Sequence, residues 1–333
     1  MAGRVTISDV AREAGVSLMT VSRVVNGKGE ISPATRQRIL DVINRLEYRP
    51  SGIARGLATQ RTGTLGLIVP DMANPFFSDV ARGAEDRARA AGYNIFVCNT
   101  DESPQREIAA LDSLEEKRVD GLVLCSSRLH DDGLRAALDH HPAAVLVNRR
   151  LSVYHVDAVL LADKEGAWTA TQHLLGSGHR AVGFLAGPLN SYSSQQRSKG
   201  YRAALQAAGI SPNPGWVRPC SYEIESGREA ARELLSDHLE LTALFCYNDL
   251  VAVGVLQACA DLGRQVPDDL ALVGFDDIPL AALVAPPLTT CHVPRYDLGD
   301  QAMRLLLKRI EGLSEAHDEI VLHPELIVRA SAP

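Results

Sequence analysis

From Thr64 onward the chain alternates short apolar runs with amphipathic segments, and this alternation restricts the fold more than any other feature of the 333-residue sequence. The apolar runs have the length of strands and are apolar on both faces. We expect strands at 65–69, 93–98, 119–125, 143–148, 158–162, 181–186, 241–247 and 270–275. We expect helices at 77–91, 104–117, 164–176, 196–208, 225–236 and 248–263. Strands that alternate with helices and are buried on both faces predict parallel sheets covered by helices.

The pattern predicts more strands than one small sheet usually holds, about nine or ten in all. We therefore expect an α/β core of two doubly wound parallel-sheet subdomains, with the chain crossing between them near Ala162 and again near Cys291. The predicted subdomains are 63–161 plus 292–320 and 162–291 plus 321–333. In such a core a ligand binds in the cleft outside the carboxyl ends of the strands.

Residues 1–50 have a different pattern, which predicts short helices instead of strands. Thr6 is a suitable N-cap for a helix over 7–14, and Gly15 can end that helix. Ser17 caps a second helix, which places Val21, Val24 and Val25 near one face and Met19, Ser22, Arg23 and Asn26 on the opposite face. One face of the second helix can therefore enter a core, while the other is free to enter a groove.

A third helix begins with Ser32 as N-cap and Pro33 at its first position. Its apolar residues, Ile39, Val42, Ile43 and Leu46, follow the helical period. Three short helices around one small core predict an all-α helix-turn-helix head. The alternative, which periodicity alone leaves open, is a helical cap packed on the larger domain.

The charge of the chain is unevenly distributed. The formal net charge is −7, but residues 1–61 carry ten Lys/Arg against five Asp/Glu, and the remaining residues carry 24 against 36. A basic head thus precedes an acidic body. Such an asymmetry indicates a polyanionic partner at one end of the molecule only.

The residue identities then extend this interpretation. The head, "TISDVAREAGVSLMTVSRVVNG" followed by "ISPATRQRILDVINRLEYRPSGIARGLATQRTGTLGLIVPD", resembles that of the lactose/galactose repressor family of bacterial transcription regulators. Matching pieces continue to the C-terminus: "NPFF", "RVDGLVL", "GHRAVGFLAGP", "RSKGYRAAL", "FCYNDLVAVG", "VPDDLALVGFDD" and "PPLTT". The resemblance implies a periplasmic-binding-protein-like core and the function of a ligand-responsive, sequence-specific repressor. The alternative is a sugar-binding receptor module without a DNA function, which the basic head opposes.

By this resemblance, small hydroxyl and amide side chains of the head contact DNA phosphates. These residues are Thr6, Ser17, Thr20, Ser22, Asn26, Ser32 and Thr35. Arg23 is the one long donor on the exposed helix face, and its guanidinium can pair with guanine O6 and N7. Leu18 and Met19 occupy base-selecting positions, where apolar side chains offer thymine-methyl contact or shape exclusion but no hydrogen bonds.

Residues 51–62 join head to body. Gly52 and Gly56 weaken a helix here, so a flexible linker is the simplest interpretation. The resemblance implies instead that 51–58 fold into a hinge helix on the operator and pair with the same helix of a second subunit. Ala54 and Leu57 would then contact DNA, with Leu57 inserted into the minor groove.

Polar and aromatic residues at the predicted strand ends suit a ligand with many hydroxyl groups. The candidate effector-binding residues are Asp71, Phe76, Phe77, Asn148, Arg149, Arg197, Tyr222, Asn248 and Asp276. Structural alternatives remain: Asn248 and Asp276 are also suitable helix caps, and the two phenylalanines are also suitable core residues. Asn148 replaces the aspartate expected before Arg149 in many sugar-responsive members. Arg149 and Arg197 together leave a sugar, a sugar acid or a phosphorylated ligand open.

Several classes of function receive no support from the sequence. The chain offers no nucleophile with a base, no metal cluster and no phosphate loop, so we expect no enzyme, metal or cofactor. The six cysteines are scattered through apolar runs, which favours buried thiols. We find neither a signal-peptide pattern nor an apolar run of about 18 residues, which favours the cytoplasm over a membrane. The end of the sequence has no heptad-patterned tail, so we expect a homodimer on a palindromic operator.

Overall fold

The computed structural model describes residues 5–25, 29–48, 61–141, 143–151, 155–313 and 316–333. The chain divides into two compact units, residues 1–63 and 64–333, which we call the head and the body. The predicted hinge residues Ala54 and Leu57 lie outside the described residues, as does Asn26.

The head contains the three predicted helices, α1 (Ile7–Ala14), α2 (Leu18–Val25) and α3 (Pro33–Arg45). Gly15 ends α1 with a φ of 62°, a left-handed conformation that glycine adopts readily. Ser32 caps α3, because its hydroxyl oxygen accepts a hydrogen bond from the backbone N of Thr35. The helices close over a core of Val10, Ala11, Ala14, Val21, Val24, Ile39 and Val42. This confirms a helix-turn-helix head.

The body contains two six-stranded sheets. The first has the order β11-β5-β4-β3-β1-β2 and is parallel throughout. Its strands are β1 (Thr64–Val69), β2 (Asn94–Asn99), β3 (Leu122–Cys125), β4 (Ala144–Val147), β5 (Asp157–Leu161) and β11 (Glu319–Leu322). The helices α5 (Pro75–Ala90), α6 (Pro104–Glu116), α7 (Asp131–Leu138) and α13 (Arg295–Ile310) belong to this half of the body.

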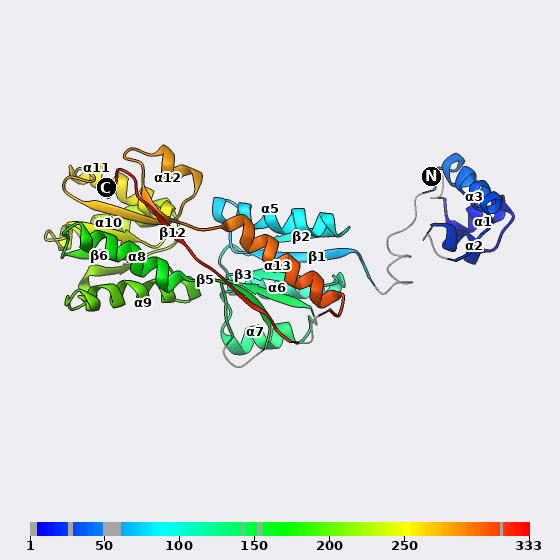
Figure 1. The fold of residues 1–333 in the computed structure, drawn as a ribbon, viewed down its shortest axis with the longest axis horizontal. Coiled ribbons are helices and arrows are strands. Elements are labelled where there is room, and N and C mark those ends of the chain that lie inside the picture. Colours follow the sequence, from blue (N-terminus) through cyan, green and yellow to red (C-terminus); the bar gives the residue numbers. More distant parts are fainter. Residues whose placement is uncertain (1–4, 26–28, 49–60, 142, 152–154, 314–315) are drawn as a thin grey trace. The chain divides into compact units, whose positions relative to one another are not determined.

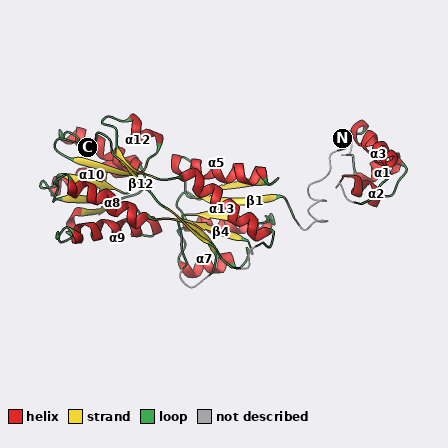
Figure 2. Cartoon of the chain, in the orientation of Figure 1, coloured by secondary structure: helices red, strands yellow, loops and turns green. Residues whose placement is uncertain are grey.

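The second sheet has the order β12-β10-β9-β8-β6-β7. Its strands are β6 (Val182–Ala186), β7 (Val217–Pro219), β8 (Ala243–Cys246), β9 (Ala271–Asp276), β10 (Thr289–His292) and β12 (Glu325–Ile327). Its helices are α8 (Asp163–Gly176), α9 (Tyr192–Ala207), α10 (Ile224–Asp237), α11 (Asp249–Leu262) and α12 (Pro279–Leu283), and a 3-10 turn spans Pro214–Trp216. Figure 2 shows helices packed around the strands of both halves. These two helix-covered sheets confirm the predicted two-sheet α/β core.

The structure differs from the predicted elements in three respects. The strands β7, β10, β11 and β12 and the helices α7, α12 and α13 were not among the predicted segments, and these strands are only three or four residues long. The pairing of β10 with β12 is antiparallel, not parallel. The strand β2 is not buried on both faces, because it lies at the edge of its sheet and leaves Phe96 and Val97 about half exposed.

The chain crosses between the two halves of the body three times: after β5, after β10 and after β11. The predicted boundary between residues 320 and 321 falls inside β11, whose four residues all pair with β5, so the crossing lies after Leu322. The helix α13 returns to the first half and packs closely on α5. Glycines allow this approach, since a Cβ at Gly83 would lie 2.0 Å from the Tyr296 carbonyl oxygen and one at Gly299 1.9 Å from that of Val80.

Candidate functional site

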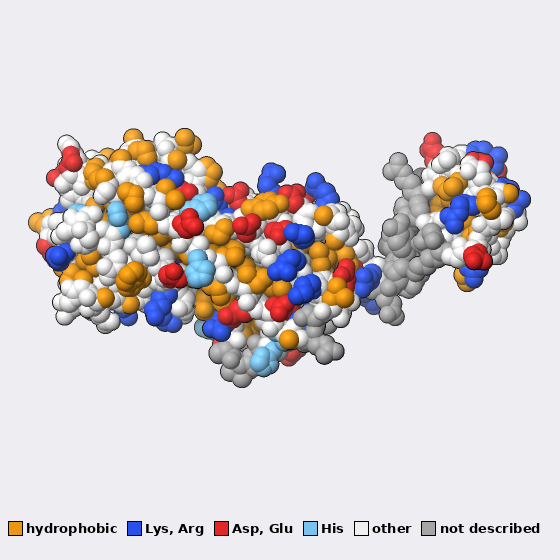
Figure 3. Space-filling view, in the orientation of Figure 1, with side chains coloured by type: hydrophobic (Ala, Val, Ile, Leu, Met, Phe, Trp, Pro, Cys, Tyr) orange, Lys and Arg blue, Asp and Glu red, His pale blue; other side chains and the backbone are white. Residues whose placement is uncertain are grey.

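The second helix of the head, α2, has one buried and one exposed face. Val21 and Val24 enter the core of the head. Leu18 and Met19, at the start of the helix, are 50% and 63% exposed. Arg23 is exposed on the same helix. In Figure 3 basic and hydrophobic side chains lie together on the visible face of the head, a composition suited to phosphates and base edges in a groove.

The hydroxyl groups predicted to contact phosphates form local pairs at the helix starts. The Ser17 Oγ accepts from the Thr20 backbone N at 3.2 Å and lies 2.9 Å from the Thr20 hydroxyl. The Ser32 and Thr35 hydroxyls lie 2.9 Å apart. The Thr6 hydroxyl donates to the Asp9 carboxylate at 2.7 Å, which holds the pKa of Asp9 below its usual value. These contacts fix the helix starts, and helix N-termini are suited to anions.

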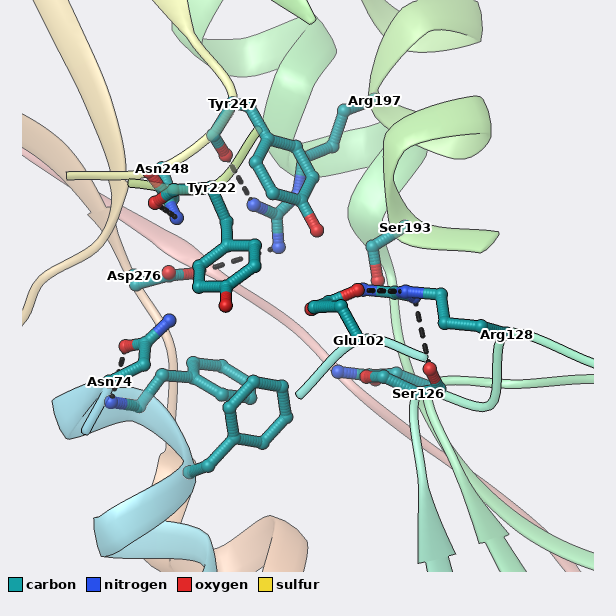
Figure 4. A pocket seen from close by; sticks show the side chains of 13 residues that line it. Asn74, Glu102, Ser126, Arg128, Ser193, Arg197, Tyr222, Tyr247, Asn248 and Asp276 are labelled. Carbon is teal, nitrogen blue, oxygen red and sulfur yellow. Dashed lines mark hydrogen bonds and ion pairs between the residues drawn. The ribbon is translucent and has the colours of Figure 1, made fainter. Parts of the chain in front are cut away.

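A pocket lies in the body between the carboxyl ends of the two sheets (Figure 4). It brings together seven of the nine predicted effector-binding residues: Phe76, Phe77, Asn148, Arg197, Tyr222, Asn248 and Asp276. Six further residues line it that were not predicted: Asn74, Glu102, Ser126, Arg128, Ser193 and Tyr247. The cavity volume is about 30 Å³, enough for one or two water molecules.

Arg197, on α9, is the most connected side chain of the pocket. Its Nε donates to the Asp163 Oδ1 at 2.7 Å, its Nη1 donates to the Tyr247 carbonyl oxygen, and its Nη2 lies 3.5 Å from the Asp276 Oδ1. The guanidinium also lies 3.6 Å from the centre of the Phe275 ring. Burial lowers the pKa of Arg197, but the Asp163 and Asp276 carboxylates outweigh burial and raise it. Arg197 thus remains a cation and orients the carboxylate of Asp276.

Asp276, at the end of β9, is a buried carboxylate. Burial raises its pKa to about 7, although Arg197 and Arg295 both favour the charged form. The group therefore changes its protonation close to neutral pH. A neighbouring hydroxyl that donates to the carboxylate would favour the charged form.

On the opposite wall, Arg128 forms an ion pair with Glu102. The Arg128 Nε and Nη2 both donate to the Glu102 carboxylate, the latter at 2.9 Å, and its Nη1 donates to the Ser126 carbonyl oxygen at 3.0 Å. Glu107 supports the same loop by accepting from the Arg128 backbone N at 2.9 Å. One feature of the sequence could have indicated that these two residues lie at the pocket, since both closely follow strands of the first sheet.

The two asparagines of the pocket differ in their free hydrogen-bonding capacity. The Asn248 Oδ1 accepts from the Val251 backbone N at 2.8 Å and its Nδ2 donates to the Tyr222 carbonyl oxygen at 3.1 Å, so Asn248 also caps α11. Asn148 has a φ of 50°, and its buried Oδ1 has no hydrogen-bond partner among the described residues. An acceptor without a partner at a pocket wall is suited to a ligand hydroxyl.

Two predicted residues do not line the pocket. Asp71 caps the turn after β1, because its Oδ1 accepts from the Ala73 backbone N at 2.9 Å. Arg149 turns away, and its Nη2 donates to the Asp131 Oδ1 at 2.7 Å and to the Leu129 carbonyl oxygen at 3.0 Å. Both side chains thus bond to local partners and do not line the pocket, although the buried Arg149 Nε has no hydrogen-bond partner among the described residues.

The raised pKa of Asp276 leads to a prediction for stability. Between its usual pKa near 3.8 and the folded value of about 7, the folded state binds a proton that the unfolded state lacks. Stability is therefore lost as the pH rises through this window. We compare the unfolding free energy of Asp276→Asn with that of wild type at each pH. We expect this difference to favour the variant by about 1–3 kcal/mol more at pH 8 than at pH 4.5. Urea unfolding across this range measures the difference, and an equal difference at both pH values would contradict the prediction.

Other chemical features of the described residues are limited. No group of three or more His, Cys, Asp or Glu residues among them is arranged to hold a metal ion. The six cysteines are free thiols. Among the described helices, none is long and apolar enough to cross a membrane.

The helix-turn-helix head and the pocket of the body define a class of protein, a DNA-binding regulator with a small-molecule domain. Comparisons with known proteins identify the family. Residues 6–51 match the model of bacterial regulatory proteins of the lacI family. Residues 62–328 match the model of periplasmic binding proteins and the sugar binding domain of the LacI family. The chain belongs to the LacI family and is a sequence-specific DNA-binding transcriptional regulator.

Individual relatives are similar to this chain over most or all of its length. Catabolite control protein A of Priestia megaterium is 39% identical over 305 residues, which cover 91% of this chain and 92% of the relative. The lac repressor dimer bound to operator and the anti-inducer ONPF superposes with a TM-score of 0.89 at 27% identity, covering 99% of each chain. The transcriptional regulator CelR in complex with cellobiose has a TM-score of 0.76 and 34% identity, covering 98% of this chain and 100% of that chain.

Proposed function

We propose that this regulator is a repressor whose affinity for operator DNA changes when a neutral sugar binds the pocket between the two sheets. The carrying observation is that each arginine lining the pocket is already paired with a carboxylate, Arg128 with Glu102 and Arg197 with Asp163. A sugar acid or a phosphorylated ligand needs a cation that is available for pairing. Neutral hydroxyl groups need donors and acceptors instead.

The pocket supplies those groups. Asn148 offers its acceptor oxygen. Burial raises the pKa of Tyr222 to about 12, so its phenol keeps a proton to donate. Phe76 and Phe77 add an apolar wall, with ring centres 5.0 Å apart in an edge-to-face arrangement. Two relatives support this ligand class: CelR is in complex with cellobiose, and a LacI family regulator from Enterococcus faecium has bound ribose.

A ligand panel tests the proposal. The full-length chain is heated with neutral pentoses, hexoses and disaccharides, with the matching uronic and aldonic acids, and with sugar phosphates. We expect at least one neutral sugar to raise the melting temperature of the chain. The same sugar should change the affinity of the chain for a palindromic DNA site that has been selected from random duplexes. Stabilisation by acids or phosphates alone would contradict the neutral ligand. Turnover of the sugar would contradict our proposal that the pocket binds without catalysis.

We further propose that the chain acts as a homodimer on a palindromic operator, in the cytoplasm where the chromosome lies. The lac repressor relative is a dimer bound to operator. The exposed edge strand β2, with Phe96 and Val97, supports self-association, because half-exposed apolar side chains on an edge strand favour a partner. The predicted hinge contacts of Ala54 and Leu57 remain part of this proposal. Sedimentation of the chain with and without the selected site tests the dimer.

The DNA-reading role of Arg23 gives a prediction of its own. We expect Arg23→Ala to weaken binding to the selected site by about 1–3 kcal/mol, because the exposed guanidinium is suited to a guanine edge. Binding to random duplex should change little. The matched control is Arg38→Ala, which removes an exposed arginine from α3. Equal losses on selected and random DNA would reduce Arg23 to a phosphate contact.

A further inference from the structure

The end of strand β9 has a strained backbone beside the pocket. Asp276 and Asp277 have φ angles of 107° and 54°, in the left-handed half of the map that residues with a side chain avoid. Such conformations persist only where surrounding groups hold them. The groups that hold this turn therefore control where the Asp276 carboxylate points.

Several of these groups belong to the second half of the body. The Asp249 Oδ2 accepts from the Ile278 backbone N at 2.9 Å. The Asp277 carboxylate accepts from the Arg329 Nη2 at 2.7 Å and lies 3.0 Å from the His292 Nδ1. These contacts fix the side of the turn that faces its own sheet.

Arg295 is different, because it belongs to α13, the helix that packs on α5 in the first half. Its Nη1 donates to the carbonyl oxygens of Asp276 and Asp277, the latter at 2.9 Å. Its Nε donates to the Asp79 Oδ2 on α5 at 2.9 Å. The Arg295 side chain is only 11% exposed, so these bonds are partly shielded from water.

The other end of this connection also lies at the pocket. Asp79 follows Phe76 and Phe77 in the first turns of α5, and both phenylalanines line the cavity. Asp276 lines it from the second sheet. One guanidinium thus links the apolar wall of the pocket to the strained turn that carries its central carboxylate.

We propose that Arg295 is a positioning residue of the effector pocket: it ties the strained turn at Asp276 and Asp277 to helix α5, so that a displacement of one wall is transmitted to the other. This inference rests on the proposed role of the pocket in effector binding. A ligand that pushes on Phe76 or Phe77 would then also move Asp276, without touching it.

Hydrogen exchange on the full-length, DNA-free chain tests the connection. The informative variant is Asp79→Asn, which removes the carboxylate that pairs with Arg295 and leaves the Arg295 bonds to the turn in place. We expect amides in 276–283 to exchange about two- to fivefold faster in Asp79→Asn. Arg295→Met should accelerate exchange in both 276–283 and 75–83. The double variant, Asp79→Asn with Arg295→Met, should show the same exchange rates as Arg295→Met alone.

A matched control lies on the same two helices, seven residues after Asp79 on α5 and one residue after Arg295 on α13. The Asp86 carboxylate, also on α5, accepts from the Tyr296 hydroxyl on α13 at 3.1 Å. Asp86→Asn therefore removes the charge from a contact between the same two helices that does not include Arg295, and exchange in 276–283 should stay at the wild-type rate. Unchanged exchange in Asp79→Asn, or an equal acceleration in Asp86→Asn, would overturn the connection.

The failure of this inference can be told apart from the failure of the proposed function. Thermal scans of the same variants with D-ribose and cellobiose as probes, together with the wider neutral panel, report sugar binding separately. If no sugar stabilises wild type, the effector proposal fails, and with it the positioning role, even where exchange shows the link. If a sugar stabilises wild type but Asp79→Asn leaves exchange unchanged, only the Arg295 inference fails.

Discussion

Arg197→Met is expected to abolish the response to effector and to lower the unfolding free energy of the body by about 3–5 kcal/mol, the usual effect of removing one partner of a buried ion pair. Methionine replaces most of the unbranched stem of the side chain but leaves Asp163 and Asp276 without their shared cation. Both carboxylates are buried, with exposed side-chain fractions of 0% and 8%. The expected loss of stability therefore comes from a buried charge without a partner. The expected loss of the effector response comes from Asp276, whose carboxylate Arg197 no longer orients.

The measurements are urea unfolding, sugar-induced stabilisation and titration of the selected operator site. Arg218→Met is the matched control, because Arg218 pairs with Glu233 and Asp237 at the surface of the same half of the body. We expect that control to lose at most about 1 kcal/mol and to keep its ligand response. Because the head is a separate compact unit, ligand-free operator affinity of Arg197→Met should stay within a few-fold of wild type. Full ligand affinity in Arg197→Met would remove the residue from the effector site.

The second large effect is expected in the head. Ile39→Ala should abolish operator binding while leaving the body intact, because Ile39 is fully buried in a small core, to which the described part of the head contributes seven buried residues. Truncating a buried isoleucine costs about 2–5 kcal/mol. A domain of this size has little stability in reserve.

Leu40→Ala is the control for this substitution, since the neighbouring side chain is 39% exposed. Far-ultraviolet circular dichroism and operator titration report on the head, and sugar-induced stabilisation reports on the body. We expect the control to bind operator nearly as wild type does. Operator binding by Ile39→Ala at wild-type strength would show that the small core carries a larger reserve of stability than its size indicates.

Local patterns were enough to predict the head and most of the central strands. The predicted helix over 7–14 coincides with α1, and Ser32 caps α3 as its sequence indicates. The prediction fails where the environment depends on distant segments. Strand β2 is as apolar as its neighbours, but its place at the sheet edge leaves it exposed, and sheet order is not encoded in local periodicity.

The pocket shows the same division. Residues at or directly after the ends of central strands, such as Asp276 and Asn148, could be placed at the cleft because parallel strands end at one edge. Arg128 and Glu102 also follow strands of the first sheet, but they were not predicted, because their ion pair joins two separate loops and local patterns do not indicate such a pair. Arg149 carries the same chemistry as a ligand-binding arginine, yet the nearby carboxylate of Asp131 turns it away from the cavity.

The interleaved path of the chain also determines the order in which its parts can be completed during synthesis. The three described helices of the head are all present once residue 45 has been made, so their shared core can form on the emerging chain. The first sheet lacks α13 and its edge strand β11 until residue 322 has been translated, and the second sheet closes only with β12 after that. A ribosome that stops early therefore releases a DNA-binding head attached to an incomplete sensor. Quality control of such fragments can then act on the incomplete body, since the three described helices of the head are already present.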